Sequence, residues 1–342
     1  MIRSRLTRIF TVLALAAMLT SLFPAGASAQ GTTVTESYSG LEALGAGYVY
    51  EGWLIIGGAP VSTGTFSVDA AGAVVPITTV QIPNAADATT FVLTIEPSPD
   101  PDPAPADTHV LAGDFVNGVA TLSIDHPAAL GTDFSASTGS FIVATPTTAT
   151  DTTDEYSGIW FLELPGGSPP PGPALDLPTL PAGWVYEGWT VVGTTPISTG
   201  TFTSVSGPDN FSGFSGPDAA PPFPGEDFIV NAPAGLTFPR DISGYPVVIS
   251  VEPVPDDSPA PFVLKPLVGE VPSPVVTGAA NSNPLAFSPD PLGGTVTISS
   301  PVSQDEELAF TGTTTNVIVG SGIALVLFGV VAARGNRRLS EV

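Results

Sequence analysis

Two pairs of glutamates are the residues whose type and spacing could do chemistry in this chain of 342 residues. Glu51 and Glu96 form the first pair, and Glu187 and Glu252 stand in matching sequence contexts farther along. Two carboxylates at a fixed geometry can act as general acid and base, or can share a hard cation. The aromatic residues that accompany Glu51 and Glu187 are Tyr50, Trp53, Tyr186 and Trp189.

A structural role competes with this chemistry for the same glutamates. In an extended strand Glu51 and Trp53 project from one face, because successive side chains alternate. Glu96 ends a run of strand-forming residues. A carboxylate in either place can accept hydrogen bonds from turn N–H groups or orient a buried Trp N–H. We favour this structural role and expect no catalytic residue among them.

Acidic residues also gather in two proline-rich segments, each of which follows the second glutamate of a pair. Calcium prefers clustered hard oxygen ligands, and extracellular modules can bind it weakly. The spacing matches no known calcium loop and prolines interrupt it, so we favour solvated acidic loops and expect no cofactor, with calcium as the alternative. The candidate ligands are Asp100, Asp102, Asp107, Asp256 and Asp257.

Other catalytic chemistry has little support in the sequence. The two histidines, His109 and His126, both precede the second glutamate pair, and the chain has no cysteine. A Ser-His-Asp or Cys-His triad, or a zinc site, would therefore have to be built on residues that do not recur. No glycine-rich phosphate-binding loop between a strand and a helix is present. We therefore expect a protein that is not an enzyme.

An internal duplication explains why the glutamates come in matching pairs. Residues 47–66 (GYVYEGWLIIGGAPVSTGTF) recur as residues 183–202 (GWVYEGWTVVGTTPISTGTF), at an offset of 183 − 47 = 136. Glu96-Pro97 returns as Glu252-Pro253, at an offset of 252 − 96 = 156. The larger second offset indicates an insertion in the second copy. Each copy is thus one module with the same order of elements.

The elements that must position these residues are short β-strands. Runs rich in Val, Ile, Thr and aromatic residues alternate with Gly, Pro, Asn and Asp throughout the body of the chain. This pattern predicts an all-β protein with two tandem β-sandwich-like domains. A Pro/Gly-rich segment, 165–181, is the expected linker between a first β-domain at 34–164 and a second at 182–299.

The N-terminus has the features of a secretion signal. Three arginines within the first eight residues precede an apolar run from Ile9 to Phe23, and small residues at Ala27 and Ala29 then form a cleavage box. The apolar run is short for a membrane span of roughly 20 residues. We expect residues 1–29 to be a signal peptide that is removed after Ala29.

The C-terminus resembles a sortase sorting signal. A short motif is followed by an uncharged stretch and then by arginines, so that residues 300–312 are a short stalk with the motif, 313–333 a transmembrane segment and 334–342 a basic cytoplasmic tail. The resemblance implies cleavage between Thr and Gly and attachment to peptidoglycan. The alternative is a C-terminal transmembrane helix that is retained, with the following arginines on the cytoplasmic side. The motif residues are Leu308, Ala309, Phe310, Thr311 and Gly312.

Charge limits the partners of the mature protein. Between Gln30 and Thr311 lie two basic residues, Arg240 and Lys265, and 31 of the 32 acidic ones, which gives 2 − 31 = −29. Such a surface repels phosphate backbones, so we expect no nucleic-acid partner. The expected partners are sortase and peptidoglycan, an extracellular ligand that the sequence does not identify, and the membrane before or instead of sorting.

The duplicated motif also resembles the extracytoplasmic domain of anti-sigma-K factors. The resemblance rests on residues 50–53 (YEGW), 60–66 (PVSTGTF) and 95–97 (IEP), which the second copy repeats at 186–189, 196–202 and 251–253. Such factors hold their sigma factor with a cytoplasmic domain, and only eight residues precede the apolar run here.

Three hypotheses follow for function. The first is an exported, surface-anchored, non-enzymatic protein, on the cell wall or in the membrane, whose acidic β-domains bind an extracellular ligand or contribute to the envelope. The second is a sensory or regulatory relative of anti-sigma-K factors that lacks the sigma-binding domain. The third is a carboxylate-based glycosidase.

Overall fold

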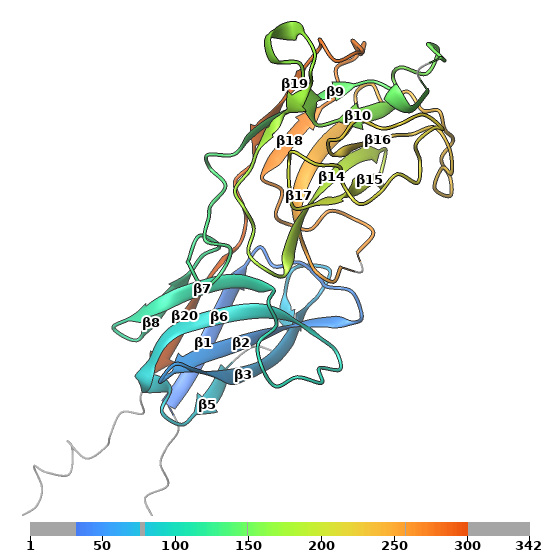
Figure 1. Cartoon of the computed structure of the whole chain (residues 1–342). Helices are drawn as coiled ribbons and strands as arrows, with labels where there is room; N and C mark the ends of the chain where they lie inside the picture. The colour runs from blue at the N-terminus through green and yellow to red at the C-terminus, as the bar shows by residue number, and fades with distance from the viewer. Residues whose placement is uncertain (1–31, 76–78, 149, 257, 300–342) are drawn as a thin grey trace, which may run out of the picture. The chain divides into compact units, whose positions relative to one another are not determined.

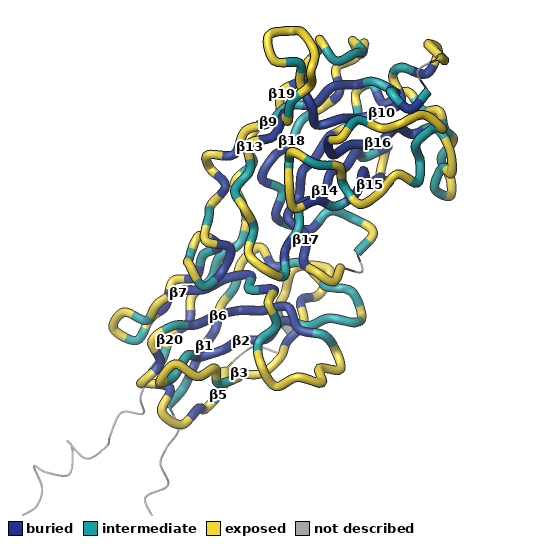
Figure 2. Tube along the Cα trace, viewed as in Figure 1, coloured by how far each residue is buried: buried dark blue, intermediate teal, exposed yellow. Residues whose placement is uncertain are grey.

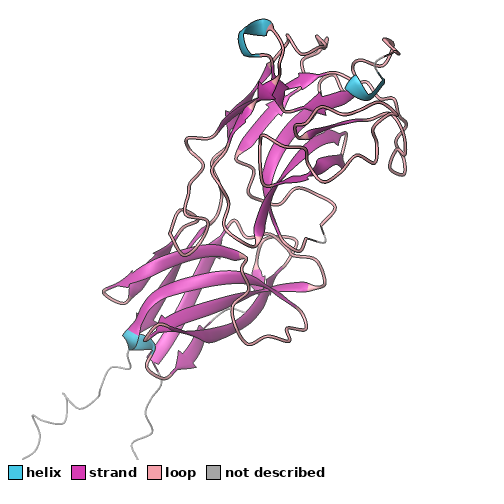
Figure 3. Cartoon of the chain, viewed as in Figure 1, coloured by secondary structure: helices cyan, strands magenta, loops and turns pink. Residues whose placement is uncertain are grey.

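The strands that the sequence predicts are present, and the prediction of an all-β fold is confirmed (Figures 1 and 3). The computed structural model describes residues 32–75, 79–148, 150–256 and 258–299. Within these ranges the helical elements are three short 3-10 turns, η1 (Ala85–Asp87), η2 (Pro146–Thr148) and η3 (Pro165–Gly167). No helix in the described ranges is long and apolar enough to cross a membrane. The residues predicted to form the signal peptide, the sorting motif, the C-terminal span and the basic tail lie outside these ranges.

The repeated motif folds into the same β-hairpin in both copies. Strand β2 (Tyr48–Ile56) pairs with β3 (Ala59–Val68), and β14 (Trp184–Val192) pairs with β15 (Thr195–Phe202). Gly57 and Gly58 form the first turn at φ 60° and 83°, values that favour glycine. Each hairpin has a register shift immediately before its Trp, because one extra residue enters the opposite strand there.

Each hairpin belongs to a nine-stranded sheet. The first sheet runs in the order β4 (Val74–Val75), β3, β2, β6 (Ala88–Pro97), β7 (His109–Val116), β8 (Val119–Leu122), β20 (Gly293–Ser299), β1 (Thr32–Ser39) and β5 (Thr79–Ile82). The second runs in the order β15, β14, β17 (Pro246–Pro253), β18 (Leu267–Glu270), β19 (Asn283–Phe287), β9 (Thr138–Val143), β10 (Gly158–Trp160) and β16 (Gly225–Asp227), with β13 (Leu175–Asp176) also on β9. Strands β11 (Leu162–Glu163) and β12 (Gly172–Pro173) form a separate pair.

The two copies exchange one strand. By chain order β9 follows β8, yet it lies between β19 and β10 in the second sheet. Strand β20 follows β19, yet it lies between β8 and β1 in the first sheet. Figure 1 shows the late strand β20 among the early strands of the first sheet, and the early strand β9 beside β19. The first sheet therefore contains β20 from the second copy, and the second sheet contains β9, with β10 beside it, from the first copy.

Register shows that β9 and β20 are equivalent strands. Ser39 of β1 pairs with Gly293 of β20, and Leu175 of β13 pairs with Gly139 of β9. Ser39 and Leu175 are related by the repeat offset, since 175 − 39 = 136. Residues 139–143 (GSFIV) and 294–298 (GTVTI) share a glycine followed by apolar residues at every second position, although this alignment lies one residue from the pairing equivalence of Gly139 with Gly293. The exchange is thus reciprocal.

The domain boundary at 165–181 does not coincide with the division between the sheets. Strands β9 and β10 lie before that segment in the chain but pair within the second sheet, and β20 pairs within the first. The end of the predicted first domain, residues 156–164, contributes β10 to the second sheet and β11 to the separate pair. Composition identifies the residues that form strands, whereas packing between distant segments determines which strands pair. The described residues all belong to one compact unit that ends at Ser299.

Burial follows the central strands of both sheets, as Figure 2 shows for β2, β6, β14 and β17. Alternation holds along β2: Tyr50 and Leu54 belong to the main hydrophobic core, whereas Trp53 packs with Val92 in a small cluster on the opposite face. The main core contains residues from both sheets. Tyr50 of β2 and Tyr186 of β14 both belong to it, and Phe134, between β8 and β9, lies edge to face with Tyr186 at a centroid distance of 6.5 Å. Both copies therefore contribute to one contiguous core.

Candidate functional site

The second copy holds its two glutamates in a buried hydrogen-bond network around Trp189. The Trp189 Nε1–H donates to Ser250 Oγ at 2.8 Å, and the Ser250 hydroxyl in turn donates to Glu252 Oε1. Glu252 Oε1 also accepts from the backbone N–H of Phe262 at 2.9 Å. Ser198, on the neighbouring strand, donates to Glu187 Oε1. The glutamate therefore orients the indole through a serine.

The first copy builds the same network with one conservative change. Trp53 Nε1–H donates to Thr94 Oγ1 at 2.9 Å, and the Thr94 hydroxyl donates to Glu96 Oε1. Glu96 Oε1 accepts from the Ala106 N–H at 2.8 Å, which closes the proline-rich loop that follows the strand. Ser62 donates to Glu51 Oε1. Such a duplicated arrangement is what a structural role predicts.

The tyrosines next to these glutamates belong to the core on the opposite face. Tyr50 donates its hydroxyl to the Glu42 carbonyl at 3.0 Å, and Tyr186 donates to the Pro178 carbonyl at 2.6 Å. The two acceptors stand at the repeat offset, since 178 − 42 = 136. Tyr50 also stacks on Phe66 at 5.5 Å. The tyrosines thus fasten the segment that precedes each hairpin.

A glycine in each hairpin makes room for an aromatic ring. A Cβ placed on Gly52 would lie 2.7 Å from the ring of Phe91, and one placed on Gly188 would lie 2.7 Å from the ring of Phe161. Phe91 comes from β6, the strand beside the hairpin, but Phe161 comes from the segment after β10. The space beside the hairpin glycine is therefore filled in both copies, but by a phenylalanine from a different segment in each.

Burial makes the carboxylates of the second copy unusually basic. Glu187 is 7% exposed and Glu252 is 1% exposed. The pKa of Glu252 is raised to about 8, chiefly by loss of hydration and also by the nearby charges of Glu187 and Asp256, against the hydrogen bonds from Ser250 and Phe262. Desolvation likewise raises the pKa of Glu187 to about 7. Burial also raises the pKa of Glu96 in the first copy.

The structure brings three of the predicted acidic residues together and leaves others apart. Glu187, Glu252 and Asp256 each place a carboxylate oxygen within 4.8 Å of the others, a geometry that could hold a metal ion. Asp100 and Asp102 are exposed and accept the N–H groups of Asp102 and Ala104, so they cap turns of their own loop.

The remaining acidic candidates stand outside this group. Asp107 is exposed, and its backbone approaches Gly183, where an added Cβ would lie 2.6 Å from the Asp107 carbonyl. Asp257 lies outside the described residues.

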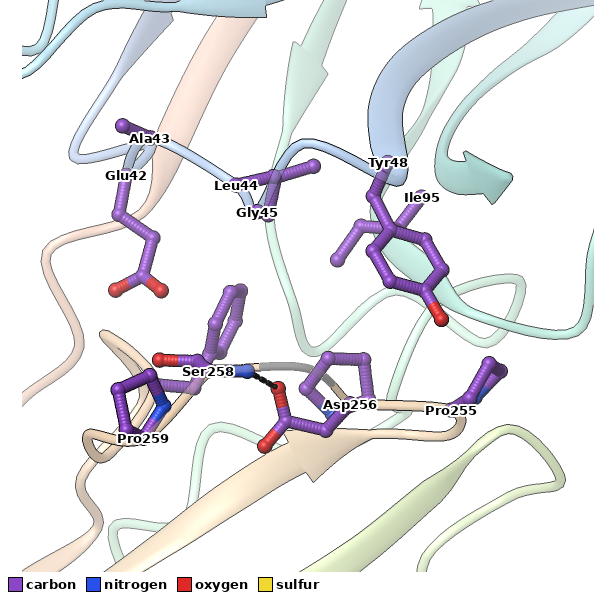
Figure 4. Close-up of a pocket in the computed structure, with 12 residues that line it drawn as sticks. Glu42, Ala43, Leu44, Gly45, Tyr48, Ile95, Pro255, Asp256, Ser258 and Pro259 are labelled. Carbon is purple, nitrogen blue, oxygen red and sulfur yellow. Dashed lines mark hydrogen bonds between the residues drawn. The ribbon is translucent and has the colours of Figure 1, made fainter. Parts of the chain in front are cut away.

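A pocket of about 250 Å³ opens beside Asp256 (Figure 4). Figure 4 shows Glu42 and Tyr48 on one side of this pocket, and Asp256, Ser258 and Pro259 on the other. Asp256 Oδ1 accepts the Ser258 N–H at 2.8 Å, which shapes the loop along the pocket wall. Burial raises the pKa of Glu42 to about 7, and Lys265 opposes this rise. The pocket therefore has apolar walls with carboxyl groups at their edges.

Comparison with known families finds a match for the first copy. Residues 10–109 match the family model of the anti-sigma-K factor rskA, C-terminal. The matched range includes Tyr50, Glu51, Trp53 and Glu96, and it ends at the first residue of β7. The resemblance expected from the repeated motif is thereby confirmed for this part of the chain. No curated protein and no solved structure matches the chain.

The match stops before the second copy, although both copies share the hydrogen-bond network. The family relationship therefore rests on the first hairpin and its neighbours, β1 to β6. The cluster of Glu187, Glu252 and Asp256 lies beyond the matched residues.

A third buried tryptophan–carboxylate pair was not predicted. Trp160 Nε1–H donates to Asp227 Oδ1 at 2.7 Å, and Thr147 donates both its N–H, at 2.8 Å, and its hydroxyl to Asp227 Oδ2. Glu226 beside it is fully buried, and desolvation raises its pKa to about 7. These residues lie outside the duplicated motif, so the repeat gave no signal for them. Trp160 and Asp227 are 67 residues apart in the chain, and the pairing of β10 with β16 brings them together.

Proposed function

We propose that the protein is an exported, surface-anchored, non-enzymatic β-module with an envelope-structural or extracellular binding role. The strand exchange carries this proposal. Strand β20 ends at Ser299, the last described residue, and it is paired on both sides, with β8 and with β1. A tether that continues from Ser299 would therefore pull on an internal strand, whose ladder hydrogen bonds share the load, and not on an edge strand.

The buried networks support a non-enzymatic role. Both Trp–hydroxyl–Glu networks connect internal groups of the fold, and Glu96 and Glu252 are each 1% exposed. A general acid or base must come within hydrogen-bond reach of the proton that it transfers. Glu96 and Glu252 each accept one hydrogen bond from the hydroxyl two residues earlier and one from a loop N–H. They therefore fix the loop that follows each strand.

Surface exposure can be tested directly because the chain has no cysteine. Single cysteines at Val116, which is 68% exposed, and at Val230, which is 42% exposed, should react with a membrane-impermeant maleimide on intact cells. A cysteine at Ser340, in a chain that also carries Thr311→Ala so that the tail is retained, is the matched control and should stay unlabelled. Labelling of Ser340→Cys with protection of the other two would reverse the proposed orientation.

Covalent attachment needs its own measurement. Mass spectrometry of the mature C-terminus should find Thr311 joined to a peptidoglycan fragment, and Thr311→Ala should shift the protein from the wall to the membrane fraction. A free Val342 in the wild type would show a retained membrane tail and would leave surface exposure intact.

The family match supports a second candidate function. Because residues 10–109 match the anti-sigma-K factor family, the second candidate is a sensory relative that signals through a partner. Deletion of the gene should then change the transcripts of one sigma-factor regulon, and re-expression of the chain should restore them. An unchanged transcriptome in the deletion strain would remove this candidate.

A further inference from the structure

Three carboxylates of the second copy are spaced as the ligands of one ion. The participating oxygens of Glu187, Glu252 and Asp256 all lie within 4.8 Å of one another. Calcium binds oxygen at about 2.3–2.6 Å, so two oxygens on one calcium ion are at most about 5 Å apart. Coulomb repulsion opposes three negative charges at this spacing unless protons or a cation compensate them.

One of these carboxylates has a buried oxygen without a protein partner. Glu252 Oε1 accepts hydrogen bonds from Ser250 and Phe262, but Glu252 Oε2 is buried and accepts none. A buried polar atom without a partner costs on the order of 1–3 kcal/mol, and more when it carries charge. A bound cation would supply the missing interaction for the same carboxylate that belongs to the three-residue group.

The basic side chains among the described residues do not supply the partner that Glu252 Oε2 lacks. The charge of Lys265 acts on Glu252 and Glu42, yet no ion pair within 4.0 Å joins Lys265 to either residue. Asp209 adds another negative charge near Glu187. The described surroundings of the three carboxylates are therefore more negative than a single lysine can balance.

We propose that the second copy binds a hard divalent cation, of the chemistry of Ca²⁺, between Glu187, Glu252 and Asp256. Calcium takes six to eight oxygen ligands in flexible geometry, so water completes the shell. Magnesium requires near-ideal octahedral geometry and dehydrates reluctantly, which favours calcium at three carboxylates held by β14, by β17 and by the loop after β17.

Solvent can reach the site from two sides. Glu187 lines a pocket of about 280 Å³ together with Ser258 and Pro259. Asp256 lines the pocket of Figure 4, which the same Ser258 and Pro259 also border. Two of the three carboxylates therefore border pockets through which water and an ion can approach.

The first copy supplies a natural control. Its equivalents by repeat offset are Glu51, Glu96 and Asp100, since 256 − 100 = 156. Among the described residues, these three do not gather as a group of ligands, although Asp100 and Asp256 each accept the N–H of the residue two positions later. Cation binding is therefore assigned to the second copy alone.

Isothermal calorimetry of the full chain with CaCl₂ tests the site. One equivalent should bind with a dissociation constant of about 10⁻⁴ to 10⁻³ M, the range of extracellular modules. Asp256→Asn removes one charge from an exposed ligand and should weaken binding by about tenfold or more, because affinity follows ligand charge. Asp100→Asn removes the same charge from the first copy and should leave the affinity within about twofold.

A second readout separates loss of the site from loss of the fold. Calcium should raise the thermal midpoint of the wild type and of Asp100→Asn, and should raise that of Asp256→Asn much less. Absence of calcium binding to the wild type would overturn the proposal. Equal weakening by Asp100→Asn and Asp256→Asn would also overturn it, because the ion would then be held by diffuse surface charge.

Discussion

Val34, near the start of the described chain, pairs with Ile298, next to its end, in the ladder that joins β1 to β20. The same ladder places Val296 in the main core, where it is fully buried. Because β9 makes the reciprocal contribution to the second sheet, neither sheet is complete without a strand from the other copy. The two repeats are thereby coupled in folding as well as in sequence.

This coupling predicts a single unfolding transition for both sheets. Val296→Ala should lower the free energy of unfolding by about 2 kcal/mol, and it should shift the first and second sheets together. Denaturant unfolding followed by Trp53 and by Trp189, each retained as the only tryptophan, measures the two sheets separately. Val116→Ala, at an exposed site on β7, is the control and should change the stability by less than about 0.5 kcal/mol. Two separate midpoints would show that the copies fold independently.

The hairpins were predictable from the sequence, and the strand exchange was not. The Gly-containing turns, the alternation of Tyr50 and Trp53, and the duplication together specify each hairpin locally. The likeness of residues 139–143 to 294–298 marks equivalent strands, but it leaves open which sheet receives which strand. That choice depends on contacts between segments more than 100 residues apart, for example Asn283 with Phe141.

The candidate site was likewise predictable from the sequence only in part. The repeat identified Glu187 and Glu252, and composition identified Asp256, but their convergence depends on the loop that follows β17. By composition Asp102 was as good a candidate ligand as Asp256, but it caps an exposed turn of its own loop and does not join the group. Nothing in the local sequence distinguishes these two aspartates, because both stand beside prolines in acidic segments.

The Trp189–Ser250–Glu252 chain predicts a large effect from a small substitution. Ser250→Ala removes the hydroxyl that links the indole N–H to Glu252 Oε1, so two buried polar groups lose a partner. The free energy of unfolding should fall by about 2–3 kcal/mol. Urea unfolding measures it, with Ser206→Ala at an exposed loop position as the neutral control. A change below about 0.5 kcal/mol for Ser250→Ala would contradict a structural role for this network.

The close contact between Gly188 and Phe161 predicts a compensating pair of substitutions. Gly188→Ala places a methyl group 2.3 Å from Thr199 Oγ1 and 2.7 Å from the Phe161 ring, and should cost about 1–3 kcal/mol of stability. Phe161→Leu in the same chain should recover part of this loss, because the smaller side chain makes room. Gly207→Ala is the matched control, since nothing lies within 4 Å of a Cβ at that position. Strict additivity of the two changes would refute the proposed contact.

Buried glutamates predict that the protein is more stable in mild acid than in mild base. The pKa of Glu252 rises from 4.5 to about 8 on folding, so the native state retains a proton that the unfolded state releases. The stability from this proton is full below about pH 4.5 and is lost as the pH rises toward 8. In EDTA, the free energy of unfolding should therefore fall between pH 5 and pH 8.

Glu252→Gln tests the origin of this pH dependence, because the amide cannot ionise. The variant should lose less stability than the wild type between pH 5 and pH 8, by a difference on the order of 2–4 kcal/mol. Asp102→Asn, at an exposed turn, should keep the wild-type slope. Denaturant titrations at intervals of one pH unit give both slopes. Parallel curves for wild type and Glu252→Gln would mean that Glu252 ionises as readily in the folded chain as in the unfolded one.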